Sequence, residues 1–530
     1  MQRDFQSPGR SAVYAENGMA ATSHPLASSA AIAILRRGGN AVDAAVAASA
    51  VLCVAEPHMT SLGGDCFAII AEADGSVHGL NGSGRAPAAL TPDFIRTADL
   101  DEVHPDHGVS VTVPGAVDAW ARLLDRFGTI GLDRALGQAI DLAEAGVPIA
   151  PRVALDWAGE AHRLTANEGA RRHYLKPDGS PPGAGDRIAF PKLAATMRLI
   201  ADVGPSGFYE GPIAEDIVAA VSAHGGCLAL ADLAAVKADW ADPISSPYRD
   251  RRVGELPPNG QGIVALIMLA ILNRFDLGRL SPLDPERLHI EVEAARLAYA
   301  CREQFVSDPD TALFPAARLL DDGHIDALAD RIDPNARMEH VGTVDPRDKT
   351  DTVYFCVVDG DGLAVSFINS LFAGFGSAIA GLDSGVLLQN RGACFVTVPD
   401  HPNEVGPGKR PMHTLIPGLL ARGDEVEAVF GVMGGHYQAC GHAHVLGNLV
   451  DYGCDPQMAI DLPRVFFAGE TTEIETTLPQ ASVDGLAARG HRLAARETPL
   501  GGGQMIAIDR TRGVLIGGSD PRKDGCAIGY

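Results

Sequence analysis

The hydrophobic positions near the N-terminus repeat with a helical period. Apolar side chains recur every three or four positions through residues 27–35, and Gly38 and Gly39 follow two arginines. This pattern predicts a helix that ends just before the paired glycines. A second, alanine-rich helix is predicted over residues 41–54, and a short strand is predicted over residues 66–71.

The central part of the chain also reads as mainly helical. Pro114 and Gly115 are expected to open a helix. The longest uninterrupted apolar run, residues 263–272, predicts a buried helix that is too short to cross a bilayer. Residues 288–308 have the pattern of an amphipathic helix.

Period-two and β-branched patterns take over in the C-terminal third. Residues 352–359 and 363–370 read as two strands of a hairpin, joined by a turn that contains Gly360 and Gly362. Residues 385–390 form a further strand-like run. The hairpin begins abruptly at Thr352, directly after a stretch of charged, loop-like residues that ends at Asp351.

Composition and charge narrow the class of protein. Of the 530 residues, 46% are hydrophobic and 21% are charged, which is typical of a globular chain with a large core. The formal net charge of −24 argues against nucleic acid or an anionic membrane surface as a partner. The first residues contain no continuous apolar run, and the nine cysteines form no CxxC pair. We therefore expect a cytoplasmic protein with free thiols.

Short sequence words, in order along the chain, resemble the γ-glutamyltranspeptidase family of N-terminal-nucleophile hydrolases. The words are SHPLAS at 23–28, GGNAVDAAVA at 38–47, VPG at 113–115, PPNGQG at 257–262, TVYFCVVD at 352–359, KRPMHTLIP at 409–417, GVMGGH at 431–436 and SDPR at 519–522. The resemblance spans nearly the whole chain. It implies an α+β fold, a four-layer αββα sandwich, and a proenzyme that cuts itself without a cofactor.

The resemblance also implies where the chain is cut and which groups react. Cleavage between Asp351 and Thr352 would give a large subunit, 1–351, and a small subunit, 352–530, which stay intertwined in one globular unit. Thr352 would be the nucleophile, with its own freed α-amine as the base. Ser370 stands where the family has a threonine, and Gly434 and Gly435 would hold the oxyanion.

The predicted substrate-binding residues are Arg85, Arg391, His413, Thr414 and Phe372. His413 and Thr414 stand where the family has two serines that contact the substrate carboxylate. Three anchors of a γ-glutamyl group are replaced, because Ser83, Phe372 and Cys394 occupy the places of an arginine, an asparagine and an aspartate. Arg85, which follows Ser83 by two positions, is the candidate carboxylate anchor among glycines.

These replacements favour a small amide that carries a carboxylate, as in the oxamate amidohydrolase branch of the family. The alternatives left open are a glutathione hydrolase or γ-glutamyltransferase, a cephalosporin-type acylase, and an uncleaved relative that only binds. A homodimer of the processed unit is also left open. His436, Cys440 and His444 lie at successive fourth positions, but they lack an acidic or complete ligand set, so no metal site is predicted.

Overall fold

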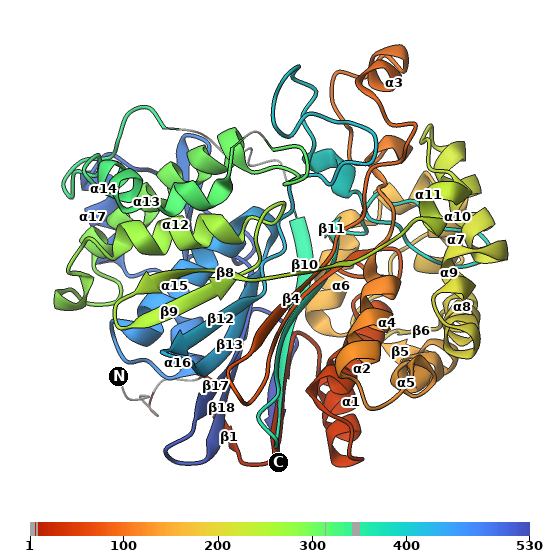
Figure 1. Ribbon diagram of the computed structural model, residues 1–530, viewed down its shortest axis with the longest axis horizontal. Helices are drawn as coiled ribbons and strands as arrows, with labels where there is room; N and C mark the ends of the chain where they lie inside the picture. Colours follow the sequence, from red (N-terminus) through yellow and green to blue (C-terminus); the bar gives the residue numbers. More distant parts are fainter. Residues whose placement is uncertain (1–5, 7–8, 313, 342–349) are drawn as a thin grey trace.

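The computed structural model describes residues 6, 9–312, 314–341 and 350–530. Two seven-stranded sheets lie face to face at the centre of the molecule (Figure 1). The first sheet contains, in spatial order, β1 (Val13–Ala15), β18 (Val514–Ser519), β17 (Gly502–Asp509), β13 (Glu425–Met433), β12 (Gly418–Arg422), β9 (Arg251–Glu255) and β8 (Ile244–Tyr248).

The second sheet contains the predicted hairpin at its centre. Its spatial order is β19 (Cys526–Gly529), β2 (Gly18–Thr22), β10 (Thr350–Asp359), β11 (Ala364–Ala373), β3 (Asp65–Ala71), β4 (Val77–Gly82) and β7 (Asp239–Ala241). The side chains along β11 are almost all buried. Such continuous burial is expected of a strand covered on both faces, and it explains why the hairpin sequence does not alternate strictly between apolar and polar residues.

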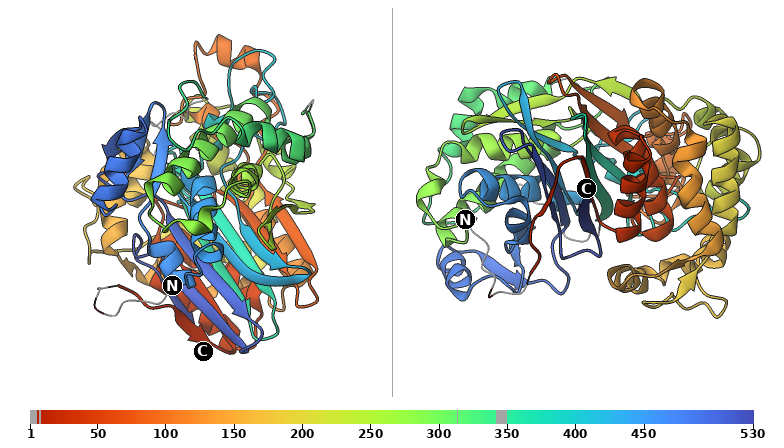
Figure 2. Two further views of the ribbon diagram at one scale, coloured as in Figure 1. Left: turned by 90° about the vertical axis from the view of Figure 1, so that its left-hand side faces the viewer. Right: turned by 90° about the horizontal axis from the view of Figure 1, so that it is seen from below.

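Helices cover the outer face of each sheet, as the further views in Figure 2 also show. On the second sheet lie α1 (Pro25–Arg36), α2 (Ala41–Ala55) and α4 (Ala116–Phe127), with α5 (Leu132–Ala145) and α8 (Pro191–Val203) outside them. On the first sheet lie α12 (Gly262–Leu272), α15 (Gln438–Val450) and α16 (Pro456–Asp461), with α13 (Pro285–Phe305) packed on α12 and α15. The predicted four-layer αββα sandwich is confirmed.

Smaller elements complete the molecule. They are α3 (Pro92–Thr97), β5 (Val147–Pro148), α6 (Pro151–Glu160), α7 (Glu168–Tyr174), β6 (Arg187–Ile188), α9 (Ser206–Tyr209), α10 (Gly211–Ala223), α11 (Leu230–Ala234), α14 (Asp322–Ala329), β14 (Val465–Ala468), β15 (Thr471–Ile474), α17 (Gln480–Ala488) and β16 (Arg492–Ala495). No helix in the described part of the chain is long and apolar enough to be a membrane span.

Two expectations from the sequence are wrong. Residues 385–390 are not a ladder strand, because they make only isolated bridges, such as Leu388 with Gly63 and Leu387 with Ala380. Helix α13 is not amphipathic in the usual sense, because α12, α15 and α17 surround it and even charged residues such as Glu293 and Arg296 are buried as a pair. In both cases the neighbours in space, rather than the local pattern, decide the outcome.

Both sheets mix strands from before and after Thr352. In the second sheet, β10 pairs with β2 on one side and with β11 on the other, and β11 pairs in turn with β3. In the first sheet, β12 pairs with β9. Segments 1–351 and 352–530 therefore share both sheets and both large hydrophobic clusters.

Candidate active site

Thr352 lies at an irregularity of strand β10. In the pairing with β11, Asp351 lies opposite Phe372 and Val353 lies opposite Asn369, with a register shift between the two pairs. Such bulges turn a side chain away from the regular ladder, and they are common beside active sites. The Thr352 side chain is completely buried, and its Oγ1 lies 2.9 Å from the Oγ of Ser370. The side chain of Asp351 lies outside the described residues.

Ser370 is held in place by the backbone that follows it. Its Oγ accepts a hydrogen bond from the backbone N–H of Phe372 at 2.8 Å. Phe372 has a φ of 78°, a left-handed conformation that is strained for a bulky residue. This turn directs the Phe372 N–H at Ser370 and so fixes the hydroxyl that faces Thr352.

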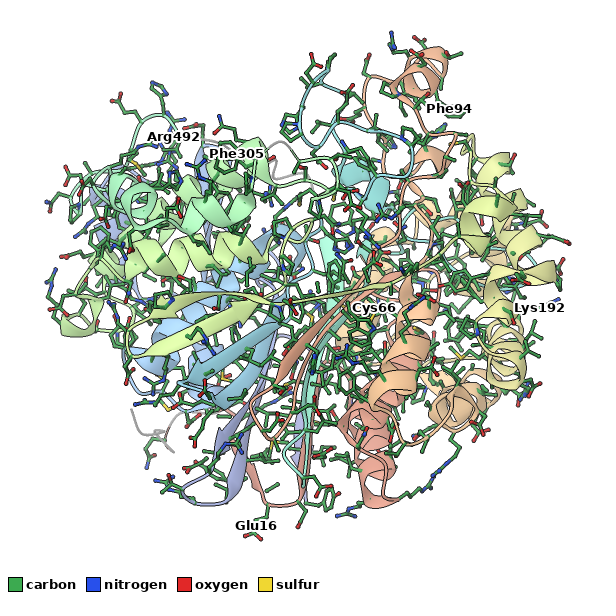
Figure 3. All side chains as sticks on the ribbon, viewed as in Figure 1. Glu16, Cys66, Phe94, Lys192, Phe305 and Arg492 are labelled. Atoms are coloured by element: carbon green, nitrogen blue, oxygen red, sulfur yellow. The ribbon has the colours of Figure 1, made fainter. Side chains whose placement is uncertain are left out.

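A buried carboxyl group, Asp65, lies next to Ser370 in the sheet. The register of β11 with β3 places Ser370 directly opposite Asp65. Gly64, which precedes Asp65, has no room for a side chain, since a Cβ there would lie 2.5 Å from the carbonyl oxygen of Ser370. The side chains of Asp65 and Ser370 thus emerge side by side. Cys66, the next residue along β3, lies deep in the interior in Figure 3.

Asp65 pairs with His413 on the neighbouring loop. Nε2 of His413 lies 3.0 Å from Oδ2 of Asp65, while Nδ1 of His413 accepts a hydrogen bond from the N–H of Leu415. The proton of a neutral His413 is therefore on Nε2 and is donated to Asp65. Burial, followed by the charges of Arg391 and Arg410, holds the pKa of His413 well below its ordinary value. Burial raises the pKa of Asp65 to about 7, against the opposing attraction of Arg391.

Arg391 is a fully buried guanidinium beside this pair. Its Nη1 donates to Oγ1 of Thr414 at 2.8 Å, and its Nε lies 3.7 Å from Oδ2 of Asp65. The guanidinium carbon lies 4.3 Å from the centre of the Phe372 ring. Within the described residues, Nε and Nη2 have no hydrogen-bond partner. Buried donors of a cation are rarely left unsatisfied, so this edge of Arg391 is suited to an acceptor that is not part of the chain.

Gly434 and Gly435 form the turn between strand β13 and helix α15. Their φ values are 118° and 52°, which favour glycine at both positions. The turn at residues 435–437 packs against β10, the strand of Thr352. The side-chain amide of Gln261 donates to the carbonyl oxygens of both Thr414 and Gly435, at 3.0 Å each. Gln261 thereby ties the glycine turn to the loop that contacts Arg391.

The structure brings together Thr352, Ser370, Phe372, Arg391 and Thr414, and Asp65 links His413 to this group. The Gly434–Gly435 turn lies against β10, the strand of Thr352. Arg85 is not among them. Its half-exposed guanidinium pairs with Asp310, Asp308 and Asp239, at 3.0, 3.5 and 3.8 Å, and it lines a separate cavity of about 340 Å³. Three carboxylates already balance the charge of Arg85. Arg391 is therefore the better placed of the two arginines to bind a carboxylate from outside the chain.

The histidines near the glycine turn have separate partners. Nδ1 of His436 faces Arg302, Nδ1 of His442 faces Glu255, and Nδ1 of His444 faces Glu291. Among the described residues, the only set of side chains spaced to hold a metal ion is His289, Glu293 and His491. There the two histidines are hydrogen-bonded to each other at 2.8 Å, and Glu293 binds Arg296 with both oxygens. These side chains satisfy one another without an ion.

Sequence reasoning missed Asp65 and Gln261. A lone acidic residue at the start of an apolar strand, directly after Gly63 and Gly64, is the signal that could have identified Asp65, because buried carboxylates need partners. Gln261 stands in the PPNGQG word, but nothing local indicates that its amide joins two distant loops.

Comparisons with known proteins agree with this architecture. A family model described as gamma-glutamyltranspeptidase matches residues 27–530. The glutathione hydrolase-like YwrD proenzyme of Bacillus subtilis (strain 168) is 36% identical over 529 residues, covering 96% of this chain and 98% of the relative. The oxamate amidohydrolase proenzyme of Klebsiella pneumoniae subsp. pneumoniae is 34% identical over 531 residues, covering 97% and 98%.

A solved structure is similar over the full length. The crystal structure of cephalosporin acylase from Bacillus halodurans superposes with a TM-score of 0.93 at 38% identity, and it covers 100% of this chain and 99% of that one. The fold is that of the N-terminal-nucleophile hydrolases. The chain belongs to the γ-glutamyltranspeptidase family of enzymes.

Proposed function

We propose that this chain is a self-processing amidohydrolase whose nucleophile is Thr352. The observation that carries the proposal is the buried hydroxyl pair of Thr352 and Ser370, 2.9 Å apart at the bulge of β10. The names of the B. subtilis and K. pneumoniae relatives as proenzymes support it. Cleavage of the Asp351–Thr352 peptide bond would free an α-amine two bonds from the hydroxyl-bearing carbon.

The proposed reaction is acyl transfer from an amide to water. The α-amine of Thr352 takes the hydroxyl proton, Oγ1 attacks the amide carbonyl, and the backbone N–H groups of Gly434 and Gly435 stabilise the oxyanion. The protonated amine then gives its proton to the leaving ammonia or amine. Water, deprotonated by the same amine, cleaves the ester bond and restores Thr352.

Ser370 has a positioning role in this scheme. Its Oγ accepts from the Phe372 N–H and lies 2.9 Å from Oγ1 of Thr352, within range to donate a hydrogen bond to the nucleophile. When Oγ1 of Thr352 accepts a hydrogen bond from Ser370, its own proton can point toward the α-amine of Thr352. The arrangement orients the nucleophile without a histidine.

The proposed substrate is a small amide with a carboxylate, of which oxamate is the first choice. The free edge of Arg391 suits a planar carboxylate, and Thr414 holds the opposite side of the guanidinium. The ring of Phe372 covers one face of Arg391 and has no hydrogen-bond acceptor for the ammonium group of a γ-glutamyl substrate. Oxamate and water would give oxalate and ammonia, as the name of the K. pneumoniae relative also suggests.

A second candidate is an acylase that acts on a cephalosporin. The full-length similarity to the B. halodurans enzyme favours it. The complete burial of Thr352 and Arg391 argues for the smaller substrate.

Ammonia release from oxamate tests the proposal. Processed wild-type protein is expected to turn oxamate over, and Thr352→Ala is expected to be inactive. Arg391→Gln should raise KM for oxamate by about 100-fold, because an ionic pair of hydrogen bonds contributes roughly 3 kcal/mol. Ready hydrolysis of γ-glutamyl-p-nitroanilide or of a cephalosporin, with no oxamate turnover, would overturn the substrate assignment.

A further inference from the structure

The immediate neighbours of Arg391 form a small charged unit that is closed to solvent. Arg391, Asp65 and His413 are each 0% exposed. With His413 neutral, the unit contains one positive and one negative charge. Arg391 and Asp65 are not in direct hydrogen-bond contact, since Nε and Oδ2 are 3.7 Å apart. The charges of Arg391 and Asp65 therefore balance, but the guanidinium is incompletely hydrogen-bonded.

We infer that a substrate carboxylate replaces Asp65 as the counter-ion of Arg391, and that Asp65 takes up a proton from solvent when the carboxylate binds. This inference rests on the proposed carboxylate site at Arg391. A second anion in the unit would leave two negative charges against one positive charge, without water to screen them. Burial makes such an excess charge costly, and protonation of one carboxylate removes it.

Asp65 is the group suited to accept this proton. Its Oδ1 accepts from the N–H of Gly84 at 2.9 Å, and its Oδ2 accepts from His413. Each carboxyl oxygen can accept more than one hydrogen bond, so these contacts survive protonation. The raised pKa of Asp65, about 7, means that little further change is needed near neutral pH.

Other titratable groups around Asp65 are less suited. Those that interact with it electrostatically are Arg391 and Arg410, His413, the thiol of Cys66 and the phenol of Tyr209. The arginines stay charged, and the pKa of His413 lies well below its ordinary range. Burial holds the pKa values of the Cys66 thiol and the Tyr209 phenol well above the ordinary values of these groups. The freed α-amine of Thr352 would titrate near neutral pH as well, so the experiment has to separate it from Asp65.

Calorimetric titration with propionate tests the inference on the processed protein. Propionate carries one carboxylate and cannot be hydrolysed, and propionamide is its neutral counterpart. Titrations in two buffers of different ionisation enthalpy count the protons taken up. Uptake of about one proton per propionate is expected near pH 8.5, with little near pH 5.5 and none with propionamide.

Substitution of Asp65 separates its proton from that of the α-amine. Asp65→Asn should abolish the uptake and bind propionate about 10–30-fold more tightly than the wild type near pH 8.5. Asp383→Asn is the matched control, because Asp383 is exposed and pairs with Lys192, which is labelled at the periphery in Figure 3. It should behave as wild type.

The outcomes are distinct. Propionate binding to the wild type without proton uptake overturns the inference even if Asp65→Asn does not fold, and so does unchanged uptake in a folded Asp65→Asn. Proton-linked binding without oxamate turnover supports the inference and contradicts the proposed reaction. Failure of propionate to bind at any pH overturns both this inference and the carboxylate site.

Discussion

At the scale of single residues, the proposed chemistry depends on one contact between two hydroxyl groups. Thr352 and Ser370 lie on neighbouring strands, and the bulge in β10 brings their oxygens to 2.9 Å. Threonine and serine are ordinary strand residues, so their types alone do not indicate catalysis. Their burial together, beside a charged unit and a glycine turn, is what distinguishes them.

Removal of the Ser370 hydroxyl should slow the reaction without preventing folding. In Ser370→Ala the hydrogen bond to Thr352 is lost, and the N–H of Phe372 is left unsatisfied. A contribution of about 1–3 kcal/mol corresponds to a kcat that is about 5–160-fold lower.

Steady-state kinetics on processed protein measure this effect. Ser370→Thr keeps the hydroxyl and is the matched control, which should retain most of kcat. Equal kcat values for Ser370→Ala and the wild type would remove Ser370 from the mechanism.

At the scale of elements, the glycine turn before α15 is a tightly constrained connection at the site. A Cβ on Gly434 would lie 2.8 Å from the Cα of Gly501, and the φ of 118° is itself unfavourable for other residues. Gly434→Ala should therefore shift the turn and lower both kcat and Tm.

A control glycine elsewhere separates an effect on the oxyanion site from a general loss of stability. Gly513 has a φ of 67° and open space around it, so Gly513→Ala should cost only about 1 kcal/mol of stability and leave kcat unchanged. Thermal melts and kinetics of both variants give the comparison. A Gly434→Ala enzyme with wild-type kcat would exclude this turn as the oxyanion site.

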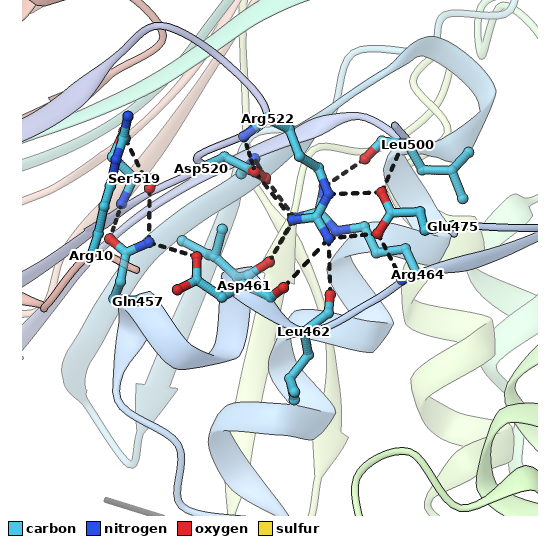
Figure 4. Close-up of polar contacts among 12 residues, drawn as sticks. Arg10, Gln457, Asp461, Leu462, Arg464, Glu475, Leu500, Ser519, Asp520 and Arg522 are labelled. Atoms are coloured by element: carbon cyan, nitrogen blue, oxygen red, sulfur yellow. Dashed lines mark hydrogen bonds and ion pairs between the residues drawn. The ribbon is translucent and has the colours of Figure 1, made fainter. Parts of the chain in front are cut away.

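The SDPR word near the C-terminus forms a buried ionic network rather than a part of the active site (Figure 4). Asp520 pairs with Arg464 at 2.6 Å, and Arg522 pairs with Glu475 at 2.6 Å. The network joins the end of β18 to β15 and to the loop after α16. Arg464→Met should destabilise the fold by about 3–5 kcal/mol, because it leaves Asp520 buried with an incomplete partner set.

Addition of Asp520→Asn to Arg464→Met should recover part of this loss, since the unpaired charge is then removed. Denaturant unfolding of the single and double variants measures the difference. A loss below 1 kcal/mol in Arg464→Met would contradict the assigned role.

The same network predicts how stability depends on pH. Burial alone would raise the pKa of Asp520, but Arg464 and Arg522 hold it at about 2, below the value of about 3.9 in an unfolded chain. The Asp520 carboxylate therefore makes its full contribution to the stability of the fold above about pH 4. This contribution is lost as the pH falls toward 2. Acid unfolding of Asp520→Asn should lack that component. An identical acid profile in the variant would contradict it.

The sequence predicted local elements well where helical periodicity and stop signals agreed. The helix expected over residues 41–54 is α2, which Asn40 opens through a capping box with Asp43. Residues 385–390 were mistaken for a strand because burial alone gives an apolar run, and only pairing makes a ladder. Asp65 was missed because its partners come from β11, the 409–417 loop and the turn at Arg391. Such contacts have no local signature.

At the scale of the whole molecule, the two segments on either side of Thr352 cannot separate without opening both sheets. Strand β10 pairs with β2, and β12 pairs with β9. We therefore expect processed protein to run as one particle under native conditions and as two chains on a denaturing gel.

Light scattering coupled to size exclusion measures the native particle. A mass near 55.3 kDa is expected for one processed unit, and twice that mass would indicate the homodimer that the sequence leaves open. Elution of free subunits would contradict the intertwined arrangement.

The central claim is that the chain cuts itself before Thr352 and that this residue then performs the reaction. Intact mass spectrometry of freshly purified protein under denaturing conditions, beside Thr352→Ala and Thr352→Ser, tests it most directly. We predict two chains, residues 1–351 and 352–530, in the wild type and in Thr352→Ser, and one uncut chain in Thr352→Ala. A single uncut chain in the wild type, or equal cleavage in Thr352→Ala, would contradict the claim.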